Sequence, residues 1–192
     1  MTSSPAPVHR LRRAERREQI LDAATRAFAR AGFIATNLDD IAREAGVTRV
    51  ILYRHFDSKA DLYRQVLDRA SARLASAVGA DHLDENSLPA LVRAAGEDPD
   101  AFRLLFRHAA REPEFRDWTD TFTAAATDVA RRSLATVIPA GPWLEWAATV
   151  IPPITIEAVI GWLDIGQPDP DRVAERIGQV ITGVFQAATL RS

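Results

Sequence analysis

The sequence predicts an all-α protein of nine helices, with a helix-turn-helix near the N-terminus. Apolar residues recur every three or four positions along most of the 192 residues, and no alternating stretch is long enough for a useful strand. Proline or glycine stands close to most of the expected helix ends. Because 47% of the residues are apolar, the chain can bury a sizeable core. We therefore expect a small helical domain followed by a larger one.

The first expected helix covers residues 14–31. Its apolar residues fall on one face, and most of its arginines lie outside that face. Gly32 is expected to end this helix in a left-handed conformation, with Phe33 packed back on the last turn.

Three more helices are expected before residue 79. Asn37 is suited to cap a short helix that stops at Gly46, and Thr48 is suited to cap a second short helix. Ser58 and Asp61 have the spacing of a capping box, which predicts the start of a longer helix.

The rest of the chain is expected to form five helices. Each begins near a serine, or near a proline preceded by an acidic residue or glycine, which are typical of helix starts. The expected ranges are 88–96, 99–111, 113–138, 142–165 and 170–189.

The charge is unevenly distributed along the chain. Residues 1–69 hold 13 Arg and Lys against 9 Asp and Glu, a net charge of +4, whereas residues 70–192 hold 11 against 17, a net charge of −6. A basic N-terminal region followed by an acidic C-terminal region favours a module that binds a polyanion, joined to a second part with another role. The chain has no cysteine, which excludes disulfides, cysteine nucleophiles and thiolate metal sites.

Residues 1–13 are expected to form a disordered basic arm. With the start of the first helix, this arm would bring arginines to a phosphate strand or a minor groove. A solvated face is the alternative, since most charge runs are solvated. The arginines are Arg10, Arg12, Arg13, Arg16 and Arg17.

No membrane partner and no secretion are expected. The most apolar stretch, residues 147–163, contains Pro152, Pro153 and Glu157 and is shorter than the roughly 20 residues that cross a bilayer, so we expect a buried helix. The N-terminal region lacks the apolar segment of a secretory signal, which favours the cytoplasm.

The segment from residue 37 to 59 predicts a helix-turn-helix. Ala42 lies four residues before Gly46, so a small residue allows two short helices to approach and glycine allows the chain to reverse. The second helix of such a motif enters the major groove of DNA. Leu52 and Phe56 are expected to be core residues, and a capping or core role is the alternative for His55. We expect the DNA contacts to come from Asn37, Thr48, Arg49, Val50, Ile51, Tyr53, Arg54, His55 and Lys59.

Three runs in this region resemble the DNA-binding domain of the tetracycline-repressor (TetR) family of bacterial regulators. They are Ala35-Thr-Asn-Leu-Asp-Asp-Ile-Ala, Ala45-Gly-Val-Thr and Leu52-Tyr-Arg-His-Phe-Asp-Ser-Lys59. The resemblance implies a TetR-like all-helical homodimer, with a DNA-binding domain at residues 14–60 and a ligand-binding and dimerisation domain at 61–192. It also implies that Tyr53, His55 and Lys59 hold phosphates, and that Thr48 and Arg49 lie near bases or backbone. Val50 and Ile51 depart from the small or polar residues often found there, although they suit contacts to thymine methyl groups.

The last two expected helices are the candidate dimer interface. The apolar stripe of the last helix includes Gly178 and Gly183, which permit close approach, so helices at about 147–165 and 170–189 from two subunits would form a four-helix contact. An ordinary buried terminal helix is the alternative.

Aromatic residues gather in the middle helices, where an apolar pocket with a few polar groups would bind a small molecule. Aromatic residues at helical spacing also suit an ordinary core. The candidate ligand residues are Phe102, Phe106, His108, Trp118, Phe122, Trp146 and Glu157.

These patterns, together with what the TetR resemblance implies, predict a sequence-specific transcriptional regulator, a homodimeric repressor that a small molecule releases from a palindromic operator. We expect no enzymatic activity, catalytic residue, cofactor or metal site, because no phosphate loop, nucleophile elbow or paired metal-binding motif is present. The alternatives are a helical enzyme, for which only His108 and Glu112 have a suggestive spacing, and a DNA-binding regulator without a ligand.

Overall fold

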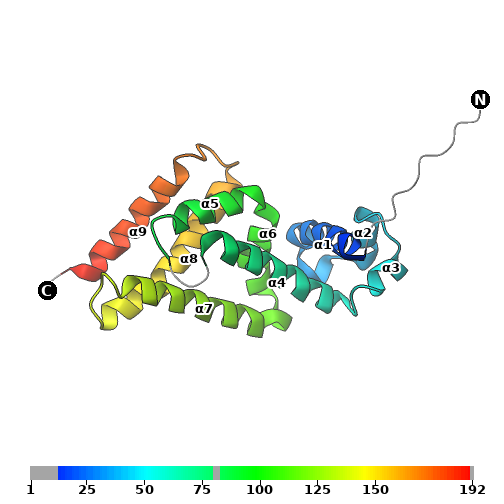
Figure 1. Cartoon of the computed structure of the whole chain (residues 1–192), viewed down its shortest axis with the longest axis horizontal. Coiled ribbons are helices and arrows are strands. Elements are labelled where there is room, and N and C mark those ends of the chain that lie inside the picture. The colour runs from blue at the N-terminus through cyan, green and yellow to red at the C-terminus, as the bar shows by residue number, and fades with distance from the viewer. Residues whose placement is uncertain (1–12, 80–82, 191–192) are drawn as a thin grey trace, which may run out of the picture. The chain divides into compact units, whose positions relative to one another are not determined.

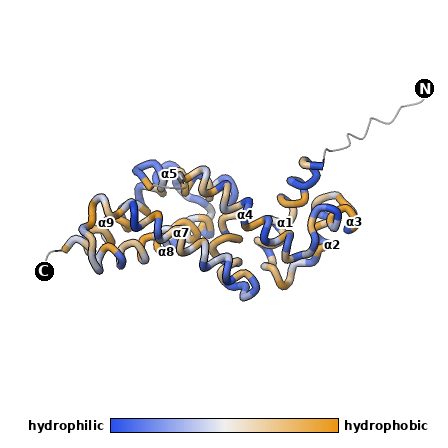
Figure 2. The backbone as a smooth tube through the Cα atoms, turned by 60° about the horizontal axis from the view of Figure 1, so that its bottom comes forward, coloured by the Kyte–Doolittle hydropathy of each residue, from blue (hydrophilic) through white to orange (hydrophobic). Residues whose placement is uncertain are grey.

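The computed structural model describes residues 13–79 and 83–190, and within these residues the chain is helical with connecting turns and no strand (Figure 1). The described part contains nine α-helices, α1 to α9, together with one π-helical and two 3₁₀ segments. The all-α class and the number of helices that the sequence predicts are therefore confirmed for the described residues. Figure 2 shows hydrophilic and hydrophobic residues alternating along most of these helices, as expected of helices that bury one side.

The chain divides into two compact units between Val66 and Leu67. The N-terminal unit contains α1 (Arg13–Ala35), α2 (Leu38–Glu44), α3 (Arg49–Tyr53) and the start of α4 (Lys59–Val78). Leu62, Tyr63 and Val66 of α4 are fully buried. These side chains explain why the N-terminal unit extends into α4 beyond residue 60.

Aromatic and aliphatic side chains from α1 and α4 form the centre of the N-terminal unit. The rings of Phe28 and Tyr63 meet edge to face with centroids 4.8 Å apart, and the ring of Phe33 lies 5.1 Å from that of Tyr63. Gly32 has a left-handed φ of 73°, as predicted, but the helix resumes after this kink and ends at Ala35 instead of residue 31. The hydroxyl of Thr36 donates to the carbonyl of Gly32 and stabilises the extra turn.

The predicted caps of α2, α3 and α4 are confirmed. The side chain of Asn37 accepts a hydrogen bond from the backbone N–H of Asp39, and that of Thr48 accepts one from Ile51. Before α4, the hydroxyl of Ser58 accepts from the N–H of Asp61, whose carboxylate accepts from the N–H of Asp57. These local bonds satisfy N–H groups at the helix starts.

The C-terminal unit contains the remainder of α4 and the helices α5 (Ser87–Glu97), α6 (Pro99–Arg103), α7 (Arg116–Leu134), α8 (Pro142–Asp164) and α9 (Val173–Thr189). Helix α8 packs against both α7 and α9. One apolar cluster joins Val159 and Ile160 of α8 to Ile177 of α9, and a second joins Leu144 of α8 to Ala188 of α9.

Three further predicted helices differ from the observed ones. The range 99–111 is α6 followed by a π-helical segment, Leu104–His108, and a 3₁₀ turn, Ala109–Arg111. The π-helical winding lets the N–H of Ala109 bond to the carbonyl of Leu104, and both residues are fully buried. In an α-helix, residues five positions apart do not lie on the same face. The sequence therefore predicted a continuous α-helix here and not the π-helical turn.

The other two differences concern helix starts and ends. The range 113–138 begins as a 3₁₀ turn that buries Phe115, becomes α7 and ends at Leu134. The range 170–189 becomes helical only at Val173, after a turn in which Asp169 adopts a φ of 47°.

Helix α8 has the length and apolar composition of a membrane-spanning helix, and it is the only described helix that does. Eight of its residues are buried, and its contacts on α7 and α9 account for that apolar composition. Pro152 and Pro153 lie inside it. A core helix with these contacts passes the same length and composition test.

Candidate nucleic-acid interface

Helix α3 has one buried side and one exposed side. Leu52 is fully buried and Phe56 almost fully, as predicted, whereas 64% of Val50 and 45% of Tyr53 are exposed. Thr48, Arg49 and Arg54 are also exposed, and Ile51 is half-buried. The helix therefore presents polar and apolar side chains on one surface, as a recognition helix does.

The turn before α3 has the geometry that the small residues predict. Gly46 adopts a left-handed φ of 60°, and the N–H of Val47 donates to the carbonyl of Ala42 over 2.9 Å. This bond closes the turn between α2 and α3. A side chain on Gly46 would be strained at this φ.

Arg49 lies at the first turn of α3 and forms an ion pair with Asp39 of α2, with 3.1 Å between Nη1 and Oδ2. No local pattern in the sequence links Asp39 to Arg49. Because the two residues belong to different helices, neither helical periodicity nor capping rules relate them.

Lys59 lies at the start of α4 beside the end of α1. Its Nζ donates to the carbonyl of Ile34 over 3.1 Å and lies 4.6 Å from the centre of the Phe33 ring. Arg49 and Lys59 both line an open hollow of about 390 Å³, together with Asn37. The Lys59 ammonium at the edge of an open hollow suits a phosphate group.

His55 is half-buried at the end of α3. Burial lowers the pKa of its imidazole, and the positive charges of Arg13, Arg17 and Arg16 lower it further. The uncharged form is therefore favoured until an anion offsets the arginines.

The predicted basic arm is only partly described. Arg10 and Arg12 lie outside the described residues, and Arg13 begins α1. Arg16 donates to Gln19, and Arg17 donates to Gln65 with its guanidinium 5.6 Å from the Phe56 ring centre. Arg16 and Arg17 thus belong to the helical unit and not to a free arm, because side-chain partners hold them there.

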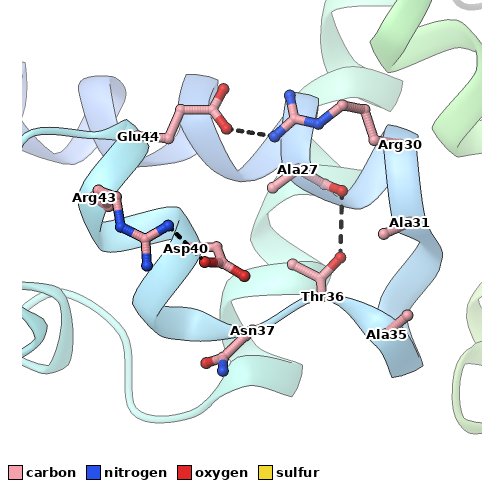
Figure 3. A pocket seen from close by; sticks show the side chains of 9 residues that line it. All are labelled: Ala27, Arg30, Ala31, Ala35, Thr36, Asn37, Asp40, Arg43 and Glu44. Atoms are coloured by element: carbon pink, nitrogen blue, oxygen red, sulfur yellow. Dashed lines mark hydrogen bonds and ion pairs between the residues drawn. The ribbon is translucent and has the colours of Figure 1, made fainter.

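Glu44 connects α2 to α1, which the sequence analysis missed. Its carboxylate accepts from Nε of Arg26 over 2.7 Å and from Nη2 of Arg30 over 2.5 Å. The hydrogen bond from Arg30 is the main reason that the pKa of Glu44 is lowered. Figure 3 shows Glu44 facing Arg30 across a hollow of about 390 Å³, with Asp40 and Arg43 paired beside it. The pairing links the end of α2 to α1.

Four predicted ligand residues form a row in the C-terminal unit. The ring centroids of Phe102 and Phe106 are 4.7 Å apart, those of Phe106 and Phe122 are 5.5 Å apart, and Trp118 stacks on Phe122 at 5.3 Å. Phe102 is buried, and the other three are half-buried.

The remaining predicted ligand residues are placed differently. Trp146 is 38% exposed and meets Trp143 edge to face at 5.8 Å, and Glu157 is exposed. His108 ends the π-helical segment next to the aromatic row in sequence. Neither hollow described above is lined by these residues. In the part of the chain that the structure covers, no three His, Asp or Glu side chains are grouped as metal ligands.

The fold and this surface define a helix-turn-helix protein of the kind that binds DNA, followed by a helical C-terminal unit. Residues 20–66 match the family model of the bacterial regulatory proteins of the tetR family. The match covers the helix-turn-helix and the first turns of α4, so this region of the chain is similar to that family.

Two relatives show how far the sequence likeness extends. The chain is 36% identical over 129 residues to the HTH-type transcriptional activator FasR of Mycolicibacterium smegmatis, a match that covers 62% of this chain and 59% of FasR. It is 52% identical over 54 residues to the HTH-type transcriptional regulator TtgR of Pseudomonas putida, which covers 28% of this chain and 26% of TtgR. The matched regions thus span less than two thirds of these relatives.

Solved structures show the same fold over nearly the whole chain. A TetR-like transcriptional regulator from Rhodococcus sp. RHA1 superposes with a TM-score of 0.81 at 20% identity, covering 95% of this chain and all of the other. NalD of Pseudomonas aeruginosa, the secondary repressor of the MexAB-OprM multidrug efflux pump, superposes with a TM-score of 0.66 at 23% identity, covering 90% of this chain and 98% of NalD.

Proposed function

We propose that this protein is a sequence-specific transcriptional regulator that binds a palindromic DNA operator as a homodimer and represses transcription until a small molecule releases it. The observation that carries the proposal is the exposed outer face of α3 above the buried Leu52 and Phe56. The match of residues 20–66 to the family model of bacterial regulatory proteins of the tetR family supports it.

The DNA contacts that we propose divide into two groups. Thr48, Arg49 and Val50 lie at the start of α3, the end of a recognition helix that meets base edges, and Ile51 is a less exposed neighbour. The remaining residues are proposed to hold phosphates, and they are Asn37, Tyr53, Arg54, His55 and Lys59. Phosphate contacts set the position on DNA, and base contacts set the sequence.

We propose that α8 and α9 of two subunits form the dimer contact. On α9, half of Val180 is exposed, and the space around Gly183 is open enough that an added Cβ would meet no atom within 4 Å. The same is true of Gly161 on α8. Small residues on exposed helix faces allow two backbones to approach closely. A two-fold dimer would place two α3 helices on half-sites about one DNA turn apart or more.

The row of Phe102, Phe106, Phe122 and Trp118 is the proposed place for the effector. Three of these rings are only half-buried, and the adjoining π-helical segment is a type of irregularity that is frequent at functional sites. An effector that binds the DNA-free form more tightly weakens DNA binding, and DNA weakens effector binding by the same factor.

Relatives of this chain differ in the direction in which they regulate transcription. FasR carries the name of an activator, and AcnR of Corynebacterium efficiens, 30% identical over 111 residues, that of a repressor. A promoter fusion in cells with and without this protein tests the sign. We expect higher expression without it, and lower expression would show activation. The protein is proposed to act in the cytoplasm, where the chromosome of a bacterium lies.

Selection from a random duplex library tests DNA recognition directly. We expect enrichment of a palindrome, confirmed by a mobility shift with the enriched duplex and by the mass of the complex in light scattering. Binding with no preference among sequences, or none at low salt, would overturn the proposal.

A further inference from the structure

The guanidinium of Arg49 is held by three groups on the exposed surface of the N-terminal unit. Nη1 donates to both carboxylate oxygens of Asp39, at 3.3 and 3.1 Å. Nη2 donates to the hydroxyl of Tyr53 at 3.3 Å, and Cζ lies 5.6 Å from the centre of the Tyr53 ring. Two helices thus restrain one side chain, α2 through Asp39 and α3 through Tyr53.

These contacts leave part of the guanidinium available. An arginine has five N–H groups, and among the described residues no partner is found for Nε of Arg49 or for the second N–H of Nη2. Nε and Nη2 lie on one edge of the planar guanidinium, and two neighbouring donors of this kind match the O6 and N7 acceptors of guanine in the major groove.

We propose that Asp39 is a positioning residue that holds Arg49 in the orientation that reads a guanine. This inference rests on the proposed function, because it names how that surface chooses a base. Asp39 acts through Arg49 and does not itself contact DNA.

An acidic residue on a DNA-binding face has a cost, since its carboxylate repels phosphates. Asp40, its neighbour, carries the same charge in the same first turn of α2, but it pairs with Arg43 of its own helix at 2.8 Å. Both carboxylates favour the helix start. Only Asp39 reaches to α3, so a role in the helix dipole does not explain its contact with Arg49.

Restraint of Arg49 before binding has a direct benefit. More than half of its side chain is exposed, so without partners it would sample many rotamers and lose that freedom on DNA. A prealigned guanidinium loses less conformational freedom on binding DNA. The same restraint also disfavours orientations that would suit other bases.

The experiment compares Asp39→Asn with Asp40→Asn. First, library selection with the wild-type protein and with Arg49→Ala identifies the base pair that depends on Arg49. Fluorescence anisotropy then measures the affinity of each variant for the selected duplex, for duplexes changed at that base pair, and for a scrambled duplex. Urea unfolding confirms that each variant is folded, which the exposed position of both carboxylates favours.

We expect a guanine at the base pair that depends on Arg49. Asp39→Asn should lower the preference for that guanine by about two- to tenfold, the range for releasing one flexible side chain. Asp40→Asn should keep the preference. Both variants should bind the scrambled duplex slightly more tightly, since each removes one negative charge. In an Arg49→Ala background, Asp39→Asn should not change base preference at all.

Several results would overturn the positioning role while leaving the proposed function intact. They are equal base preference in Asp39→Asn and Asp40→Asn, an unchanged selected sequence in Arg49→Ala, and a further change of preference when Asp39→Asn is added to Arg49→Ala. A wild-type protein without any sequence preference would instead overturn the proposed function, and with it this inference.

Discussion

The indole Nε1 of Trp118 in α7 donates a hydrogen bond to Oδ1 of Asp68 in α4 over 2.8 Å. This bond joins two helices of the C-terminal unit at the end of the aromatic row, where Trp118 stacks on Phe122. It restrains one of the rings of the proposed effector site.

Replacing Trp118 should separate these two contributions. Trp118→Phe keeps a ring for stacking and loses the hydrogen bond, so we expect a loss of about 1 kcal/mol in the free energy of unfolding. Trp118→Ala loses both and should cost more, about 2 kcal/mol or above. Urea unfolding followed by circular dichroism measures both values, with Trp143→Phe on the exposed face of α8 as a control that should change little. Equal values for the two Trp118 variants would contradict a role for stacking.

Lys59→Ala should weaken binding to every DNA sequence. A lost phosphate contact lowers the salt dependence of affinity by about 0.9 in the log–log slope for each subunit. Lys59→Arg should restore most of the slope, because it keeps the charge. Anisotropy titrations at several salt concentrations measure it. Arg111→Ala, in the C-terminal unit, is the matched loss of one positive charge, and a slope that falls equally in that variant would argue against a local contact.

DNA binding should strengthen as pH falls from about 7.5 to 6, in part through His55. Its pKa is lowered in the free protein, so the imidazole is uncharged at neutral pH, and nearby phosphates favour the charged form. His55→Gln should remove part of the pH dependence, whereas His108→Gln should not. Anisotropy at a fixed ionic strength tests this, and identical pH profiles in wild type and His55→Gln would exclude His55 as the titrating group.

The same lowered pKa has an opposite consequence for stability. The unfolded chain binds a proton near the ordinary pKa of about 6.5, while the folded protein binds it only at lower pH. Stability should therefore fall as pH drops through about 6.5, and stop falling below the folded pKa. Thermal unfolding of wild type and His55→Gln in the absence of DNA should show a steeper fall for wild type. A fall that is equally steep in the variant would refute the assignment.

Glu44→Gln should loosen the contact between α1 and α2. We expect a loss of about 0.5–1 kcal/mol in the free energy of unfolding, since its partners Arg26 and Arg30 are about half exposed. Because the pKa of Glu44 is lowered, its contribution is present above the unfolded value of about 4.3 and disappears as pH falls through the folded pKa. Urea titrations at about pH 7 and pH 3 measure the difference. A deficit of the same size at both values would show that charge is not its cause.

Gly183→Arg should separate the subunits. The added side chain meets no atom of its own chain near the Cβ, so the monomer should fold, but it would enter the proposed contact between α9 helices. Sedimentation equilibrium should show a dimer for wild type and a monomer for the variant. Ala124→Arg, at an exposed position of α7, serves as the control and should remain dimeric. A monomeric wild type, or a dimeric Gly183→Arg, would contradict the proposed interface.

Features that depend on a few neighbouring residues were predictable. The caps at Asn37, Thr48 and Ser58 follow from side chains that bond to N–H groups two or three residues away. The burial of Leu52 and Phe56 follows from their apolar character and spacing. Such interactions depend only on residues that are close together in the sequence, so they can be predicted without the positions of distant residues.

Features that depend on distant residues were not predictable. The ion pairs of Glu44 join residues 14 and 18 positions apart, and that of Asp39 and Arg49 joins residues 10 apart on two helices. The π-helical winding at Leu104–His108 lies within an ordinary helical pattern. Trp146 is aromatic like the other predicted ligand residues, yet its ring packs against that of Trp143.

By itself the sequence determined the all-α class and the helix-turn-helix, and it named the side chains that are proposed to contact DNA, because helical periodicity, caps and turn residues act over short distances. Tertiary structure alone decided which of those side chains touch one another. Surface charges have many candidate partners of opposite sign, and only the packing of α1, α2 and α3 brings Glu44 to Arg30 and Asp39 to Arg49. For that reason the orientation of Arg49, and with it the proposed choice of a base, depends on the folded arrangement of the helices.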